Sequence, residues 1–288
     1  MRDLNYELKQ MCQRNQDGSF ATRRDRERIL DRVADQLYEL GFRDLRAGSL
    51  KPKHIAAICE LWKTEGLAAG TVKNRMSEIR WWAEKIGKQN IVARNNADYG
   101  IANRVYVTSV SKARELTTGD LSKITDPYTK MSLKLQAAFG LRLGESIKIR
   151  PEWADRGDRL ALKDTWTKGG HAREIPIRSE AQRQTLEEAK ALARNGSLIA
   201  PENNYAKQLR RFEYQCELAN IHKVHGHRHH YAQTRYKELT GWAAPAAGGP
   251  RSKELSPVQK DADHLARLQI SRELGHFREQ VTAIYLGR

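Results

Sequence analysis

The sequence predicts a fold that is mainly α with a small antiparallel β-sheet, and it predicts two domains. Apolar residues recur every three or four positions through most of the chain, which is the helical period. One stretch, 159–177, alternates apolar and polar residues as short strands do. A length of 288 residues suits two modest domains. Polar residues cluster after Asn90, so we place a linker at 103–113 and the domains at 1–105 and 106–288.

The amino-terminal half is predicted to be a set of helices joined by short loops. Gly41 follows the second predicted helix, where a left-handed C-cap is favoured. Pro52 suits the first turn of the third, because its fixed φ matches the helix. The predicted helices of this half cover 4–13, 23–40, 52–64 and 71–86.

The carboxyl-terminal half is predicted to mix helices with two or three strands inside 159–177. Lys168-Gly169-Gly170 interrupts these strands and is typical of a hairpin turn. Ser179 and Gln182 form a capping box that opens a helix, and Gly196 closes it. The proline-containing stretch 241–257 predicts a loop. The other predicted helices cover 121–124, 129–139, 205–218, 225–239, 261–274 and 279–285, and the turn at 140–145 enters a further one.

The charge of the chain indicates a nucleic-acid partner. Lysine and arginine total 51 against 35 acidic residues, which gives a formal net charge of +16. The corresponding pI is about 9.8. A strongly basic domain binds polyphosphate because each neutralised phosphate releases condensed counterions. The alternative is a basic surface that serves only solubility.

Two helices carry candidate DNA-binding residues. In the helix 71–86, apolar residues form a buried face, and Lys73, Ser77 and Arg80 follow one another along the opposite face. A basic, hydrogen-bonding helix edge of this kind suits a DNA groove, although a solvated stripe has the same pattern. The helix 205–218 presents a second basic side, formed by Lys207, Arg210 and Arg211.

The sequence gives no indication of secretion or membrane insertion. No run approaches the roughly 20 apolar residues of a membrane span, and the first residues lack the apolar stretch of a signal peptide. We therefore expect a cytoplasmic, nucleoid-associated protein. Cys12, Cys59 and Cys216 are odd in number and far apart, so they predict reduced thiols, with neither a disulfide framework nor a zinc finger.

Several familiar catalytic signatures are absent from the sequence. It contains no GxxxxGK[ST] phosphate loop, no dinucleotide-binding glycine fingerprint, no HExxH and no GxSxG. Five histidines within 222–230 raise the question of a metal site. However, neighbouring His229 and His230 point apart on a helix, and no fourth ligand has compatible spacing. We therefore expect no metal and no cofactor.

Five short motifs do follow one another in the carboxyl-terminal half. They are Gly140-Leu141-Arg142 with Glu145, Lys168 in the predicted hairpin, His225 with Arg228, Leu274-Gly275-His276, and Tyr285 nine residues after that histidine. This set resembles the catalytic domain of the tyrosine recombinase (phage integrase) family, over 116–285. The helical pattern of 1–105 is similar to the core-binding DNA-binding domain of the same family. The resemblance implies a helical core-binding domain followed by a mixed α/β catalytic domain.

The resemblance implies a role for each motif residue. Tyr285 would attack a scissile DNA phosphate, forming a 3′-phosphotyrosyl bond and releasing a 5′-hydroxyl. Arg142 and Arg228 would bind the non-bridging phosphate oxygens, supplying the charge that a metal supplies elsewhere. Lys168 would protonate the departing 5′ oxygen. His225 would act as general acid and base on the tyrosine, and His276 would donate a hydrogen bond to the phosphate. Glu145 is expected to orient an arginine.

The resemblance also implies partners: double-stranded DNA, a homotetramer on paired DNA sites, and accessory DNA-bending proteins, with no membrane. Some features depart from the family pattern. The third position of the His225 motif is His227 where the family has an aliphatic residue, and 241–257 lengthens the usual gap. Only Leu286, Gly287 and Arg288 follow Tyr285, which puts the family's exchange of tails between protomers in doubt.

Three other functions fit parts of the sequence. A non-catalytic DNA-binding protein on a degenerate recombinase fold would share the charge and the fold without the reaction. A metal-dependent nuclease would use the histidines of 222–230 and lose activity on chelation. A topoisomerase that cuts single strands would use the same residues as a recombinase.

Overall fold

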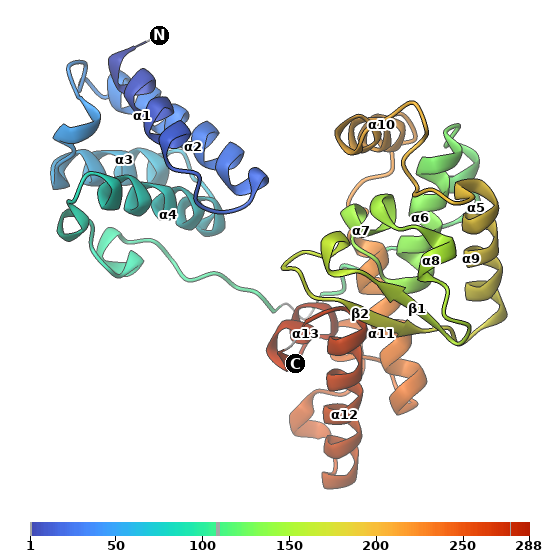
Figure 1. Ribbon diagram of the computed structural model, residues 1–288. Helices are drawn as coiled ribbons and strands as arrows, with labels where there is room; N and C mark the ends of the chain where they lie inside the picture. Colours follow the sequence, from blue (N-terminus) through green and yellow to red (C-terminus); the bar gives the residue numbers. More distant parts are fainter. Residues whose placement is uncertain (1, 108–109, 277) are drawn as a thin grey trace. The chain divides into compact units, whose positions relative to one another are not determined.

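The computed structural model describes residues 2–107, 110–276 and 278–288 and confirms a mainly helical fold with one small antiparallel sheet. The chain forms two compact units, Met1–Val105 and Tyr106–Arg288 (Figure 1). The linker predicted at 103–113 includes residues 108–109, which lie outside the described residues.

The amino-terminal unit is built from helices around an apolar core. Ser19 accepts a hydrogen bond from the backbone N–H of Thr22, so the second helix begins before its predicted start. Trp62 and Trp82 are fully buried, and the Trp82 indole donates to the carbonyl oxygen of Ala47 over 2.9 Å. The elements are α1 (Asp3–Arg14), α2 (Phe20–Glu39), α3 (Pro52–Thr64) and α4 (Ala69–Lys85), with short 3-10 turns at Ala47–Ser49, Gln89–Ile91 and Asn96–Tyr99.

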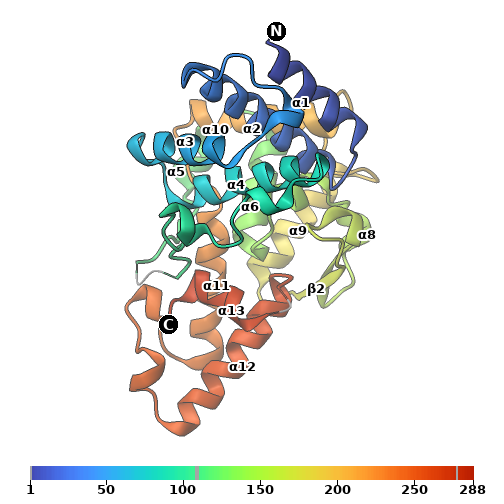
Figure 2. The same ribbon diagram turned by 90° about the vertical axis from the view of Figure 1, so that its left-hand side faces the viewer.

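The carboxyl-terminal unit surrounds the long helix α11, which packs against α6, α12 and α13 (Figures 1 and 2). Its helices are α5 (Thr118–Ser122), α6 (Pro127–Phe139), α7 (Leu143–Lys148), α8 (Pro151–Ala154), α9 (Glu180–Ala193), α10 (Tyr205–Leu218), α11 (Gly226–Thr240), α12 (Pro257–Glu273) and α13 (Glu279–Leu286).

The predicted strands form one antiparallel pair, β1 (Arg159–Leu162) and β2 (Arg173–Pro176). Leu160 faces Ile175 in the register, and both side chains are buried. The connection 163–172 is longer than the tight hairpin turn that the sequence suggests. It contains a 3-10 turn whose Trp166 packs edge-on against Trp153, with ring centroids 5.3 Å apart.

The stretch predicted as a loop, 241–257, contains two 3-10 turns, at Pro245–Ala247 and Ser252–Glu254. The following helix begins at Pro257, four residues before the predicted 261. Ser256 caps it by accepting from the backbone N–H of Gln259, and Pro257 occupies the first turn without needing a hydrogen-bond partner.

The three cysteines are buried and form no disulfide. Burial raises the pKa of each thiol, Cys12, Cys59 and Cys216, to about 11. The prediction of reduced thiols is thus consistent with their apolar surroundings. Over the described part of the chain, none of the helices combines the length and the apolarity needed to cross a bilayer.

Candidate active site

Arg142 is placed by a sharp turn between two helices. Helix α6 ends at Gly140, whose φ of +61° is the left-handed conformation that favours glycine. Arg142 then becomes the N-cap of α7, and Glu145 lies in the first turn of that helix. The Glu145 carboxylate accepts from the Arg142 backbone N–H and from its guanidinium, each over 2.8 Å. Glu145 therefore orients Arg142, as the sequence predicts.

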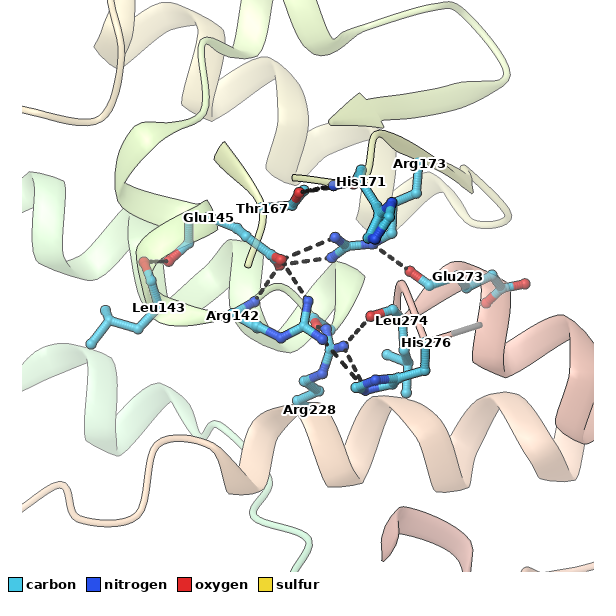
Figure 3. Close-up of polar contacts among 12 residues, drawn as sticks. Arg142, Leu143, Glu145, Thr167, His171, Arg173, Arg228, Glu273, Leu274 and His276 are labelled. Atoms are coloured by element: carbon cyan, nitrogen blue, oxygen red, sulfur yellow. Dashed lines mark hydrogen bonds and ion pairs between the residues drawn. The ribbon is translucent and has the colours of Figure 1, made fainter. Parts of the chain in front are cut away.

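Arg228 is almost entirely buried, with 1% of its surface exposed. Its guanidinium donates to the carbonyl oxygen of Gly140, at the end of α6. It also donates to the carbonyl oxygen of Leu274, at the end of α12 (Figure 3). Its Nε lies 3.3 Å from the Tyr285 hydroxyl oxygen. Burial lowers the pKa of Arg228 to about 10. The side chain stays charged at neutral pH and joins three helices at one point.

His276 reaches the same point because α12 ends in a second left-handed turn, at Gly275 with φ +65°. Its Nε2 lies 3.3 Å from Nη2 of Arg228 and 3.5 Å from Nη2 of Arg142 (Figure 3). Burial, together with the charges of Arg228 and Arg142, lowers the pKa of His276 to about 3. The imidazole is therefore neutral at physiological pH and able to accept a hydrogen bond at one nitrogen.

Tyr285 lies on α13 with only 5% of its surface exposed. Its hydroxyl oxygen is 3.2 Å from Nε2 of His276 and 3.5 Å from Nε2 of His225. The His229 ring packs 4.6 Å from the tyrosine ring, and the Gln233 amide donates to the Tyr285 carbonyl oxygen over 2.9 Å. The tyrosine is thus held at both its hydroxyl and its backbone.

The structure brings together five of the six predicted catalytic residues, namely Arg142, His225, Arg228, His276 and Tyr285. The sixth, Lys168, is exposed in the connection 163–172. Within that connection, the Thr167 hydroxyl donates to the His171 carbonyl oxygen over 2.8 Å. Among the described residues, no hydrogen bond or ion pair joins Lys168 to the other five.

The site also contains a buried arginine that was not predicted from the sequence, Arg173. It lies on β2, and its guanidinium donates to both oxygens of Glu145, over 3.0 and 2.7 Å (Figure 3). Its Nε donates to the carbonyl oxygen of Glu273 over 2.9 Å. One signal was available, because strand alternation places Arg173 on the same face as buried Ile175. The alternation shows which face of β2 Arg173 lies on, but it does not show that Glu145 is its partner.

The candidate DNA-binding residues of α4 differ in whether their side chains are already hydrogen-bonded within the protein. Ser77 is exposed, and the Lys73 ammonium donates to the Asn103 side chain over 3.1 Å. The Arg80 guanidinium donates to the Asn96 side chain over 2.8 Å and to the Ala93 carbonyl oxygen over 3.1 Å. Arg80 is therefore engaged in holding the 3-10 turn at Asn96–Tyr99 against α4.

On α10 the three basic candidates lie on the exposed side of the helix, as the sequence predicts. Lys207 and Arg210 are exposed. Arg211 is half-exposed and pairs over 2.7 Å with the buried carboxylate of Asp126, the N-cap of α6. Its position is thus fixed from within the unit, whereas Lys207 and Arg210 are available to a ligand.

The histidines around Tyr285 are not arranged as a metal centre. Throughout 2–107, 110–276 and 278–288, no three histidine, cysteine or carboxylate side chains are placed to hold a metal ion. Burial, followed by the neighbouring His225, lowers the pKa of His229 to about 4. Desolvation likewise lowers the pKa of His225, with Arg228 the next cause. Both rings are therefore neutral neighbours of the tyrosine at physiological pH.

The fold is that of solved recombinases. The chain has a TM-score of 0.62 to a lambda integrase dimer bound to a COC′ core site, with 15% identity over 99% of this chain and 78% of that one. It has a TM-score of 0.62 to the XerH site-specific recombinase bound to palindromic difH substrate, with 14% identity over 99% and 81%. It has a TM-score of 0.54 to the Tn1549 transposon integrase in complex with circular intermediate DNA, with 14% identity over 100% of this chain and 96% of that one.

Two family models match the sequence in chain order. The model described as "Phage integrase, N-terminal" matches residues 1–92, and the model described as "Integrase" matches residues 100–234. Curated protein sequences contain no match to the chain. The two models, which match successive parts of the chain, therefore point to one family. The chain belongs to the phage integrase family, the tyrosine recombinases.

Proposed function

We propose that this protein is a site-specific recombinase or integrase that cuts and rejoins DNA strands through a 3′-phosphotyrosyl intermediate at Tyr285, without metal or ATP. The observation that carries the proposal is the position of the Tyr285 hydroxyl. It lies 3.2–3.5 Å from Nε2 of His276, Nε of Arg228 and Nε2 of His225, all in one chain. The hydroxyl oxygen, which is the proposed nucleophile, therefore lies within contact distance of a proton acceptor and of a permanently charged guanidinium.

Each of the six residues has a role in the proposed phosphoryl transfer. The Tyr285 oxygen attacks phosphorus, and its proton passes to the neutral imidazole of His225. The bond from phosphorus to the 5′ oxygen breaks, and Lys168 protonates that oxygen once DNA draws the connection 163–172 to the site. Arg142 and Arg228 stabilise the charge that develops on the non-bridging oxygens, and His276 hydrogen-bonds to the phosphate.

The reverse reaction rejoins the strands. A 5′-hydroxyl from the partner strand attacks the phosphotyrosyl phosphorus, Lys168 takes its proton, and the tyrosine recovers a proton from His225. One phosphoester bond forms as another breaks in each direction, so the energy of the DNA backbone is conserved. For this reason the reaction needs no nucleotide hydrolysis.

We further propose that both units bind double-stranded DNA as core-binding and catalytic domains, 1–105 and 106–288. Ser77 and Lys73 on α4, and Lys207 and Arg210 on α10, offer polar and basic side chains to phosphate. The net charge of +16 supports a phosphate-rich partner. A related fold, with a TM-score of 0.61 and 16% identity, is a lambda integrase tetramer bound to a Holliday junction. We accordingly propose a homotetramer on paired DNA sites.

The test is covalent capture of DNA. The wild-type protein is incubated in EDTA with nicked suicide substrates that carry candidate sites from the DNA flanking its gene, and adducts that survive SDS are measured. Tyr285→Phe is expected to bind DNA as the wild type does and to form no adduct. Tyr6→Phe, a change at a tyrosine that is 51% exposed in the other unit, is the matched control and forms the adduct normally.

Three results would overturn the proposal. An adduct formed by Tyr285→Phe would show that another residue is the nucleophile. DNA binding without any wild-type adduct would favour the non-catalytic DNA-binding protein. Cleavage that disappears in EDTA and returns with a divalent metal would favour a metal-dependent nuclease.

A further inference from the structure

Three separate elements that carry the candidate chemistry meet at the buried side chain of Arg173. Through Glu145 it is linked to the turn that holds Arg142. Through the Glu273 carbonyl oxygen it is linked to the end of α12, just before His276. Its own strand, β2, follows the connection that contains Lys168.

The hydrogen bonds around Glu145 are unequally divided between its two arginines. Arg173 binds the carboxylate through both of its terminal nitrogens, over 3.0 and 2.7 Å. The Arg142 guanidinium binds it through one nitrogen only, over 2.8 Å. A bidentate pair is the stronger and more directional of the two arrangements. The carboxylate is therefore mainly the partner of Arg173.

The exposed fractions of Glu145, Arg173 and Arg142 also pair the carboxylate with Arg173. The side chains of Glu145 and Arg173 are 1% and 4% exposed, whereas that of Arg142 is 19% exposed. Arg142 can reach a ligand, but Arg173 is enclosed behind it. A Cβ at Gly275 would come within 2.9 Å of the Arg173 Cδ, so this arginine also packs tightly under the turn that carries His276.

The charges of the cluster suit a phosphate in the transition state. Three guanidinium groups and one carboxylate leave a net charge of +2 on Arg142, Arg173, Arg228 and Glu145. A phosphodiester carries one negative charge, and additional charge develops on its oxygens during the displacement. Without Arg173, the carboxylate would be neutralised by Arg142 alone, and the charge offered to the phosphate would fall.

We propose that Arg173 is a positioning residue, which takes up the charge of Glu145 so that Arg142 remains available to the scissile phosphate, and which fixes the turn that carries His276. This inference rests on the proposed function, because it concerns the same phosphate. Because its side chain is only 4% exposed, Arg173 acts in this proposal through Glu145 and the His276 turn and does not contact DNA.

The experiment measures single-turnover adduct formation on the suicide substrate and, separately, DNA affinity and thermal unfolding. The variants are Arg173→Met, Arg173→Lys and the double variant Arg173→Met with Glu145→Gln. Arg159→Met is the matched control, because Arg159 lies on the partner strand in exposed ion pairs with Asp158 and Glu174. We expect this control to react as the wild type does.

Arg173→Met is expected to bind DNA with unchanged affinity and to form the adduct about a hundredfold more slowly, as for a displaced catalytic group. Arg173→Lys, which keeps the charge, retains more activity than Arg173→Met. In the double variant the carboxylate charge is also removed, so the rate recovers by about tenfold relative to Arg173→Met. A purely structural role would make the double variant slower or no faster.

The pH dependence gives a second readout. Burial opposes ionisation of Glu145, but the hydrogen bond and charge of Arg173, with Arg228 and Arg142 nearby, lower its pKa to about 2. In Arg173→Met this pKa rises, so lowering the pH protonates Glu145 and frees Arg142. The deficit of Arg173→Met relative to wild type is therefore expected to shrink as pH falls, whereas that of the double variant stays constant.

The outcomes separate this inference from the proposed function. A wild-type protein that forms no adduct refutes both. A wild-type adduct with Arg173→Met at the wild-type rate, or with no recovery in the double variant, refutes only the role of Arg173. If Arg173→Met does not fold, Arg173→Lys decides: a folded Arg173→Lys that binds DNA but forms no adduct would overturn the inference.

Discussion

Replacement of Gly140 by alanine tests whether the turn before Arg142 organises the site. Gly140 has φ +61°, and a Cβ there would lie 2.7 Å from Cδ1 and 2.9 Å from Cγ of the buried Tyr231 ring. The same glycine supplies the carbonyl oxygen that accepts from the Arg228 guanidinium. The substitution therefore strains the backbone and overpacks the core. It also displaces the carbonyl oxygen that holds Arg228.

The magnitude follows from two costs. A left-handed conformation costs a residue with a side chain about 1–2 kcal/mol. Forcing a methyl group against a packed ring costs about 1–3 kcal/mol more. Gly157→Ala is the matched control, because Gly157 has φ +80° but nothing within 4 Å of its Cβ position. The difference between the two variants isolates the clash, and it amounts to roughly 2–12 °C in Tm for a domain of this size.

The assay combines thermal unfolding with covalent capture of DNA. Gly140→Ala is expected to melt well below Gly157→Ala and to form the phosphotyrosyl adduct more slowly, whereas Gly157→Ala cleaves normally. Equal melting temperatures would refute the packing argument. A destabilised Gly140→Ala that still cleaves at the wild-type rate would refute the link between this turn and the position of Arg228.

Three further predictions concern leaving-group chemistry, salt and pH. Lys168→Met slows adduct formation on ordinary DNA but not on a substrate with sulfur at the scissile 5′ position, because a thiolate departs without a proton; equal slowing on both would contradict a general acid. DNA affinity falls steeply between two salt concentrations, and a titration that shows a flat response would exclude phosphate-dominated binding. The free energy of unfolding falls as pH drops from 6.5 to 5.5, because His229 and His276, with pKa values of about 4 and 3, stay neutral in the folded state while the unfolded chain takes up protons. This loss is at most about 1 kcal/mol per histidine and smaller where solvent screens the ring, and equal urea midpoints at the two pH values would contradict it.

The basic helix faces show how far a sequence pattern can be taken. The helical period correctly assigns Val72 and Met76 to the buried side of α4 and Arg80 to the other side. However, periodicity cannot show that the Arg80 guanidinium is bound to Asn96 within its own unit. On α10 the same reasoning places Arg211 on the polar side, whereas its pair with Asp126, 85 positions away, comes only from the fold.

Local features of the fold can be inferred from the amino-acid sequence. Helix ends follow from capping residues such as Ser179 and Gly140. The motifs identify the groups that can bind or attack a phosphate, because this chemistry depends on residue type. The contacts between distant functional groups could not be inferred in this way. The contact of Arg142 with His276 spans 134 positions and that of Arg173 with Glu273 spans 100. Such contacts depend on how helices and strands pack, and no local period records them.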